Sequence, residues 1–406
     1  FAPPHLNAGT RGMGLLTRYI IIELLKVFLV ALTGMSTLML LVFLIYEAIR
    51  QGLTASAAIQ LIPYMMPHAL CFAIPGTILF SVCSVFGRMA SANEVVAIKS
   101  LGISPQAIIF PVFTLSFTLS LVTVWLNDVA FSWGREKAYQ VVLNHVEQTI
   151  YGKLATSRRF DNGRFSINVL DVQGDYLIRP VLEIRDKDSN NVKTVTAARA
   201  KLKSDPIKGV LIVTAEQGEF KDNQISFRFE DAEIIEFPLS DVTKKDLSER
   251  RPSEFAIRDI PKQIELLLGE LAELKREMAF QAAFQLASGD AASLRSTPWH
   301  HRTKDLEQHY ARLHRFNTET WRRFASGFSC LFFVVVGAPL AIRLKTADVW
   351  NSFALCFFPI LIVYYPLLAF GLDRAKSGEL PPYIVWGGNL VLGCVGVWLY
   401  RKVLRY

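Results

Sequence analysis

Six long stretches of the sequence contain no Asp, Glu, Lys or Arg and are largely apolar. They are 27–46, 51–87, 100–127, 324–342, 349–372 and 380–400. Each is long enough to cross about 30 Å of hydrocarbon as a helix that rises about 1.5 Å per residue. Buried helices of a large soluble protein would not form two clusters of three such stretches. The pattern therefore predicts a membrane α-helical protein with six transmembrane helices, arranged as three plus three.

The second stretch, 51–87, is longer than one simple span needs. A proline inside a helix removes a backbone hydrogen bond and clashes with the preceding turn. We therefore expect Pro63 and Pro67 to separate a short interfacial helix, about 54–62, from the span itself. Pro75 is expected to kink that span.

The block 128–323 holds most of the charged side chains and must lie in water. Over its first part apolar and polar residues alternate, so that Phe165, Ile167 and Val169 would share one face of a strand. Asp-Asn-Gly, Asn-Asn and Asp-Pro turns separate the alternating runs. Short runs at this spacing predict an inserted antiparallel β jelly-roll or sandwich domain over 128–259.

The apolar face of such a sheet has two possible uses, which alternation alone does not separate. It can pack into a closed core, as in an ordinary sandwich, or it can stay open and bind a lipid. We favour the closed core, because alternation of this kind is what any sheet with one buried face produces.

The period of the apolar residues changes from two to that of a helix after Pro252. The apolar positions that recur at helical spacing are Ile264, Leu267, Leu268, Leu271 and Leu274. Pro261 suits a first helical turn, and a second helix is expected to run from about 303 into the fourth span. We interpret 260–323 as a helical connector that leads back to the membrane.

Four histidines of the connector raise the possibility of a metal site. They are His300, His301, His309 and His314. Their spacing does not place three of them on one helical face, as a helix-borne metal site would need. We interpret them as solvated side chains and expect no metal.

The charges that flank the spans predict an orientation. With the amino terminus inside, the basic inner flanks are Arg11, Arg18, Lys26, Arg88, Lys99, Arg343, Lys345, Arg401, Lys402 and Arg405, against Glu23, Glu94 and Asp348. The short outer loops balance Arg50, Arg374 and Lys376 against Glu47, Asp373 and Glu379. An excess of Lys and Arg marks cytoplasmic loops. Both termini are therefore expected in the cytoplasm and 128–323 outside, and the net charge of +8 needs no nucleic-acid partner.

These patterns divide the chain into five parts. The parts are a disordered Pro- and Gly-rich leader (1–16), transmembrane helices one to three (17–127), the β-domain (128–259), the helical connector (260–323) and transmembrane helices four to six (324–406). All five cysteines fall inside spans, and no CxxC pair occurs, so a disulfide framework is not expected.

Several kinds of chemistry have no motif in this sequence. The chain lacks GxxxxGK[ST], GxSxG and HExxH, and its apolar stretches carry no ionisable Asp, Glu, Lys or Arg for a proton or ion relay. We therefore expect no ATPase activity, no cofactor and no secondary transport. If the protein moves a substrate, the energy comes from a partner.

A short polar segment between the second and third spans carries a helix-start pattern. Ser91-Ala92-Asn93-Glu94 predicts a capping box, in which Ser91 accepts from the amide of Glu94 and the Glu94 carboxylate reaches back. Gly102 and Pro105 predict the end of the helix. The pattern indicates a helix of two to three turns over 91–101. Glu94 either only caps this helix or belongs to a surface that docks on a cytosolic motor, and the pattern leaves both open.

Three segments resemble the LptF/LptG permease family of the lipopolysaccharide export transporter. They are FAIPGTILFSVCSVFGRMASANEVVAIKSLGIS, RYIIIELLK in the first span and WRRFASGFSCLFFVVVGAPLAI in the fourth. The three-plus-three layout around an exported β-domain is similar as well. The similarity covers nearly the whole chain, apart from the leader and the segment 262–316, which is longer than the family usually needs.

The resemblance implies a permease subunit in the cell inner membrane that extracts lipopolysaccharide or a related glycolipid. Two related permeases pair and bind a dimeric cytosolic ABC ATPase through their coupling helices, here 91–101. The residues that the resemblance and the local pattern assign to this contact are Arg88, Ser91, Asn93, Glu94, Val95 and Ile98, and Glu94 matches the family's acidic residue there. The β-domain would lie in the periplasm and pass the lipid to bridge proteins of similar fold.

The resemblance further implies that the lipid enters between spans one and five of opposing subunits. Acyl chains need apolar walls, and anionic phosphates need cations near the outer rim, where charges are poorly screened. Family members often carry such cations late in the first span, whereas this chain has Phe43 there. The expected lipid contacts are therefore Phe43, Tyr46 and Arg50.

Three other functions compete with lipid transport. A mechanotransmitting ABC-type subunit would act on an exported partner without carrying lipid. A membrane-anchored enzyme would need an acid–base or nucleophile constellation in 128–323, and the sequence shows none. The third is a purely structural scaffold.

Overall fold

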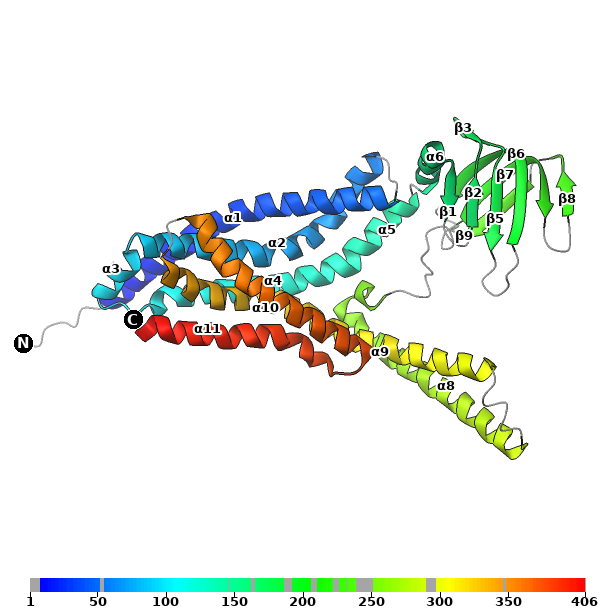
Figure 1. Ribbon diagram of the computed structural model, residues 1–406. Coiled ribbons are helices and arrows are strands. Elements are labelled where there is room, and N and C mark those ends of the chain that lie inside the picture. Colours follow the sequence, from blue (N-terminus) through cyan, green and yellow to red (C-terminus); the bar gives the residue numbers. More distant parts are fainter. Residues whose placement is uncertain are drawn as a thin grey trace, which may run out of the picture. The chain divides into compact units, whose positions relative to one another are not determined.

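A computed structural model describes residues 8–51, 55–144, 146–161, 165–185, 192–205, 210–221, 226–231, 233–238, 251–289, 297–345 and 348–405. The chain forms two compact units (Figure 1). One comprises 1–39, 67–132 and 255–406, and the other 40–66 and 133–254. Residues 8–16, which the sequence analysis placed in a disordered leader, belong to the first helix instead.

Six helices are long and apolar enough to cross a membrane. They are α1 (Ala8–Gln51), α2 (Ala55–Ser91), α4 (Gln106–Val129), α9 (Thr297–Leu344), α10 (Val349–Ser377) and α11 (Gly387–Arg405). In chain order three of them precede the β-strands and three follow. The expected break between Pro63 and Pro67 is wrong, because α2 continues through both prolines. In hydrocarbon a helix has no water to take over its backbone groups, so local adjustment of the helix costs less than ending it.

Close helix contacts in the first unit depend on glycine. A Cβ built on Gly327 of α9 would lie 2.4 Å from Cγ2 of Val124 and 2.9 Å from its backbone nitrogen. A larger residue would therefore push α4 and α9 apart. The apolar core around these helices includes Phe86 of α2 and Phe333 of α9, both almost fully buried.

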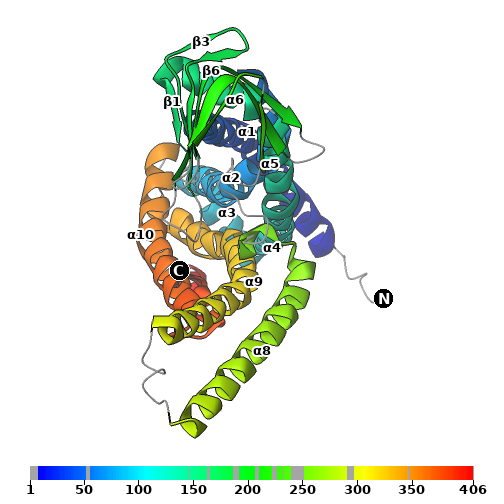
Figure 2. The same ribbon diagram turned by 90° about the vertical axis from the view of Figure 1, so that its right-hand side faces the viewer.

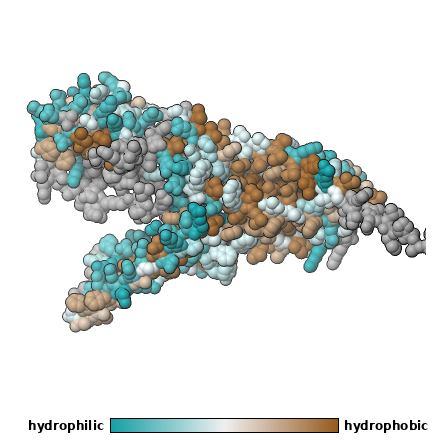
Figure 3. All heavy atoms as spheres, turned by 180° about the vertical axis from the view of Figure 1, so that it is seen from behind, coloured by the Kyte–Doolittle hydropathy of each residue, from teal (hydrophilic) through white to brown (hydrophobic). Residues whose placement is uncertain are grey.

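The spans are packed very unequally. In the most apolar part of α2, and likewise in that of α9, 67% of the residues are buried, compared with 6% in α1 and 17% in α10. Spans two and four therefore form the centre of the bundle. Spans one and five leave most of their apolar side chains exposed or only partly buried, and Figure 3 shows apolar surface gathered over the membrane helices.

Three further helical segments follow α4 along the chain. The π-helix η1 (Ala130–Gly134) leads directly into α5 (Arg135–Asn144), which precedes α6 (Val146–Ser157). A π-helix is wider than an α-helix and occurs mostly as a single turn, frequently at functional sites. It lies here at the boundary of the two compact units, between residues 132 and 133.

All the described strands pair antiparallel in a single nine-stranded sheet. They are β1 (Arg159–Asp161), β2 (Phe165–Asn168), β3 (Asp171–Gln173), β4 (Tyr176–Ile178), β5 (Val181–Arg185), β6 (Val192–Asp205), β7 (Val210–Lys221), β8 (Ser226–Phe229) and β9 (Glu233–Pro238). The long strands β6 and β7 pair with each other from Thr194↔Lys221 to Asp205↔Val210. β5 and β4 share the other side of β6, and β8 and β9 share that of β7. Antiparallel pairing is confirmed; the jelly roll remains a prediction.

Helix α6 packs against this sheet and contributes to its core (Figure 1). Ile150 and Leu154 are fully buried with residues of the strands, such as Leu182. The hydroxyl of Tyr151 donates to the carbonyl oxygen of Asp175 at 2.6 Å and accepts from the amide of Leu202 at 2.9 Å. Burial raises the pKa of this hydroxyl above its ordinary value. The sheet thus has a packed core that a helix completes.

A helical hairpin precedes the fourth span (Figure 2). It consists of the short 3₁₀ segments η3 (Pro252–Glu254) and η4 (Ile257–Asp259), α8 (Ile260–Ala287) and the first half of α9. Leu267 and Leu271 of α8 pack on Leu313 and Phe316 of α9. Helix α9 then continues without a break into the membrane region. The shaft of the hairpin is hydrophilic in Figure 3, whereas its far end exposes Phe280 and Phe284.

Candidate functional site

Two parts of the structure are candidate sites, and the first is the short helix α3 (Glu94–Ser100). The predicted capping box is wrong. Ser91 is the last residue of α2, and its hydroxyl donates to the carbonyl of Arg88 at 2.9 Å. The residue that precedes α3 is Asn93, which has a left-handed φ of 57° and no side-chain capping bond. Asn tolerates this conformation better than most residues, so α3 begins three residues later than predicted.

The end of α3 agrees with the sequence. The amide of Gly102 donates to the carbonyl of Lys99 at 2.9 Å, and the amide of Ile103 to that of Ile98 at 3.3 Å. These two bonds form a Schellman motif, which requires the left-handed φ of 78° that Gly102 adopts. Gly102 therefore ends the helix as predicted.

Helix α3 is fixed to the bundle by one face. Val95 is 4% exposed in the apolar core, and Ile98 packs against that core. Lys99 donates from Nζ to the carbonyl of Val403 near the end of α11, at 3.2 Å. Before α3, Arg88 of α2 forms an ion pair of 2.9 Å with Glu23 of α1. These contacts join α3 and its approach to three membrane helices.

The opposite face of α3 is open. Val96 is 49% exposed, and Leu101, just after the helix, is 77% exposed. Asn93 is exposed and Glu94 is half-buried. Val95 and Ile98 were predicted to contact a partner, but the structure turns both toward the bundle. The apolar side chains that a partner would meet are instead Val96 and Leu101, which sequence spacing without packing does not identify.

The predicted lipid contacts lie late in α1. Phe43 is half-buried and Tyr46 is 62% exposed. Arg50 belongs to the same helix, and its side chain lies outside the described residues. Along α1, Glu23, the partner of Arg88, lies near the start of the helix and Tyr46 near its end.

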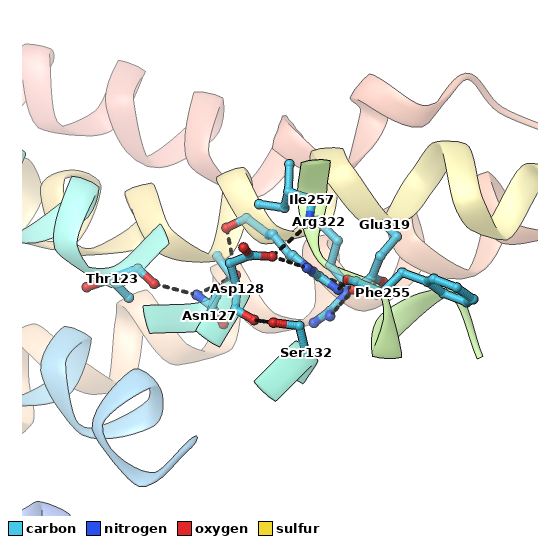
Figure 4. Close-up of polar contacts among 10 residues, drawn as sticks. Thr123, Asn127, Asp128, Ser132, Phe255, Ile257, Glu319 and Arg322 are labelled. Carbon is cyan, nitrogen blue, oxygen red and sulfur yellow. Dashed lines mark hydrogen bonds and ion pairs between the residues drawn. The ribbon is translucent and has the colours of Figure 1, made fainter. Parts of the chain in front are cut away.

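The second candidate site is a buried polar cluster at the other end of α4, here called the Arg323 junction. Its members are Asp128 of α4, Phe255 and Ile257 of the segment before α8, and Glu319, Arg322 and Arg323 of α9 (Figure 4). The Arg323 side chain is 0% exposed. A buried guanidinium is tolerated only where its charge and its donors are matched by nearby groups.

Arg323 is bonded on all three of its nitrogens. Nε donates to Glu319 at 3.0 Å, Nη1 to Asp128 at 2.7 Å, and Nη2 to the carbonyl of Phe255 at 2.8 Å. The same Asp128 oxygen also accepts from the backbone amide of Ile257 at 2.8 Å. A single guanidinium and a single carboxylate thus connect three segments that are far apart in the sequence.

The neighbouring side chains complete the charge balance. Arg322 forms a two-bond ion pair with Glu319: its Nη2 donates to Oε1 at 2.6 Å, and its Nε donates to Oε2 at 2.9 Å. Its guanidinium carbon also lies 5.0 Å from the centre of the Phe131 ring. Arg322 therefore interacts with Glu319 of its own helix and with the Phe131 ring of η1. Arg323 bonds in addition to Asp128 of α4 and to the segment before α8.

Sequence reasoning did not identify this junction. Arg322 and Arg323 were visible as charges that flank the fourth span, and Asp128 as the first charge after the third. Charged residues that stand directly at the ends of two apolar stretches can form an ion pair if the two spans are neighbours. Nothing in the sequence establishes that α4 and α9 are neighbours.

Other chemistry is limited in the part of the chain that the structure describes. Among those residues no group of three or more His, Cys, Asp or Glu could hold a metal ion. The cysteines Cys71, Cys83, Cys330, Cys356 and Cys394 are free thiols.

A family model described as "Lipopolysaccharide export system permease LptF/LptG" matches residues 18–402. The match includes α3, the sheet and the helical hairpin as well as the membrane helices. None of the curated proteins compared with the chain matches it.

Proposed function

Because the chain belongs to the LptF/LptG family of lipopolysaccharide export permeases, we propose that it extracts lipopolysaccharide, or a related glycolipid, from the inner membrane. It would do so as a permease subunit of an ABC transporter, paired with a second permease of the same family. A cytosolic ATPase dimer supplies the energy. The β-domain lies in the periplasm and passes the lipid to bridge proteins, while α3 and both termini lie in the cytoplasm.

The observation that carries this proposal is the uneven packing of the spans. In the most apolar parts of spans one and five, only 6% and 17% of the residues are buried. The apolar sides of these two spans must therefore be covered by other molecules. Bilayer lipid, a second permease and the acyl chains of a substrate all provide it. A cavity between spans one and five of two paired subunits would have walls of this kind.

Helix α3 supports the coupling to an ATPase. Its inner face is fixed by Val95 and by the bond from Lys99 to α11. Its outer face presents Glu94, Val96 and the adjacent Leu101. A helix attached on one side and open on the other transmits the movement of a bound partner to the spans that it joins, here α2 and α4.

The headgroup of the lipid would be recognised near the outer end of span one. Phe43 and Tyr46 suit acyl chains or the sugar boundary, and Arg50 suits a phosphate, since a guanidinium forms paired charge-assisted hydrogen bonds with phosphate oxygens. Family members often have a cation at the depth where this chain has the apolar Phe43. Arg50 is therefore our candidate for the phosphate contact within span one.

Site-specific photo-crosslinking tests whether the chain carries lipid. A photoreactive residue in place of Tyr46 should form a lipopolysaccharide adduct in the complex purified from native membranes. Trp398 of α11 is the matched control, because it is 59% exposed against 62% for Tyr46. An adduct only at position 46 supports the proposal. No adduct at position 46, or equal adducts at both, would favour a mechanotransmitting subunit that carries no lipid.

A further inference from the structure

The Arg323 junction connects two of the four places where the chain passes between its compact units, those at the two ends of the segment 133–254. On the way out, Asp128 lies just before η1 and the unit boundary at 132. On the way back, Phe255 is the residue at which the chain re-enters the first unit, and Ile257 lies two residues later. Arg323 bonds to Asp128 and to the carbonyl of Phe255, and Asp128 accepts from the amide of Ile257.

The chemistry of this contact makes it firm. The guanidinium is fully buried, and each of its bonds is charge-assisted or goes to a backbone carbonyl. Removal of one partner would leave a buried charge unmatched, which costs far more than the loss of an exposed ion pair. The junction therefore holds both crossings in one arrangement, and its bonds are expected to break together rather than one by one.

The element that follows the junction is of a different kind. The π-helix η1 begins two residues after Asp128 and leads out of the unit. Such turns depart from regular helix geometry and are the points at which a long helix can change direction. A fixed anchor at Asp128 followed by an irregular turn confines bending to the segment beyond the anchor.

We propose that Arg323 is a positioning residue for the transfer of lipid from the membrane helices to the β-domain. It holds the outgoing and returning crossings together, so that a movement of α4 and α9 displaces both at once. This inference rests on the proposed function, because it concerns a step of that transport. Arg323 acts through the segments that it holds and does not itself contact the lipid.

The test compares Arg323→Gln with Arg322→Gln. The control removes a neighbouring arginine that bonds to Glu319 of its own helix and lies 5.0 Å from the Phe131 ring, so it leaves the bonds of Arg323 to both crossings in place. Hydrogen exchange of 129–134 and 255–259 is measured in each complex. We expect Arg323→Gln to accelerate exchange in both segments by about tenfold or more, and Arg322→Gln to leave exchange in 255–259 at the wild-type rate.

A second measurement in the same complexes detects a role in transport beyond a structural one. Photoreactive residues replace Tyr46 in the first span and Phe227 in the sheet, and lipid adducts are quantified with ATP present. In Arg323→Gln the adduct at 227, divided by that at 46, should fall about tenfold, whereas Arg322→Gln should keep the wild-type ratio. A wild-type ratio in Arg323→Gln overturns the inference.

Asp128→Asn covers the case in which Arg323→Gln does not assemble. The Asn side chain keeps the size of Asp and can still accept from the amide of Ile257, but it removes the charge that faces Arg323. A reduced adduct ratio in an assembled Asp128→Asn complex supports the inference, and a wild-type ratio overturns it. If the wild-type protein forms no adduct at 46, the proposed function fails, and the inference about lipid transfer fails with it. If the wild-type protein forms the adducts and the variants keep its ratio, only the inference is refuted.

Discussion

The two ends of helix α4 are joined to the rest of the bundle in opposite ways. Before its start, α3 is fixed by a small apolar face and by one lysine bond to α11, and the nearby Arg88–Glu23 pair has side chains that are 47% and 29% exposed. At its end, Asp128 bonds to Arg323, whose side chain is fully buried. Exposed pairs contribute little and adjust readily, whereas buried charge clusters are costly to break. The first end suits a helix that must move with a partner, and the second suits a crossing that must stay fixed.

The largest effect on stability is expected at the buried end. Arg323→Met keeps most of the side-chain volume but leaves Asp128 without its charged partner. Breaking a buried pair in this way costs about 3–5 kcal/mol. The midpoint of thermal unfolding in detergent, followed by tryptophan fluorescence, should fall clearly. An unchanged midpoint would show that the two ends of α4 do not differ as described.

A smaller effect is expected where α4 and α9 touch between the two ends. Gly327→Ala would place a methyl group against the backbone of Val124, and such overpacking typically costs about 1–3 kcal/mol. Gly337→Ala is the control, since the nearest atom there, at 2.4 Å, is the flexible end of Leu79. The unfolding midpoint should fall for Gly327→Ala and change less for Gly337→Ala. The reverse order would contradict the close α4–α9 contact.

At the exposed end the expected change is slight. Glu23→Gln removes the ion pair with Arg88, which at this exposure contributes about 0–1 kcal/mol. The same unfolding assay should give a midpoint close to that of the wild type, and added salt should reduce even this difference. A loss as large as that of Arg323→Met would mean that the two ends are equally rigid.

The last variant should leave stability unchanged and alter binding alone. Glu94→Arg reverses a half-buried charge on α3, and we expect it to abolish co-purification of the ATPase without a shift in the unfolding midpoint. Ser91→Ala, which removes only the bond to the Arg88 carbonyl, should co-purify the ATPase normally. Equal loss from both variants would contradict a specific role for Glu94 in binding the ATPase.

The sequence predicted those features that follow from composition or from a single residue. The spans are evident because charged residues are absent from them, and the end of α3 because Gly102 adopts a conformation that few other residues tolerate. The start of α3 was predicted wrongly, because the pattern Ser-x-x-Glu does not reveal that α2 continues through Ser91.

Features that depend on long-range packing were not predictable. Asp128 and Arg323 are 195 residues apart, and no local pattern records which charges meet after folding. For the same reason the sequence identified α3 but not its exposed side, since the burial of Val95 is decided by helices distant in the chain. The uninterrupted passage of α2 through Pro63 and Pro67 likewise depends on the surroundings of the helix rather than on the prolines themselves.

The central claim is that lipid moves from span one to the β-domain only when a separate ATPase drives the permease. The most direct test places a photoreactive residue at Phe227 and follows lipopolysaccharide adducts in the purified complex with and without ATP. The account predicts an adduct at 227 that requires ATP and is absent in the Glu94→Arg variant. An adduct that forms equally without ATP, or no adduct at 227 while ATP is hydrolysed, would contradict it.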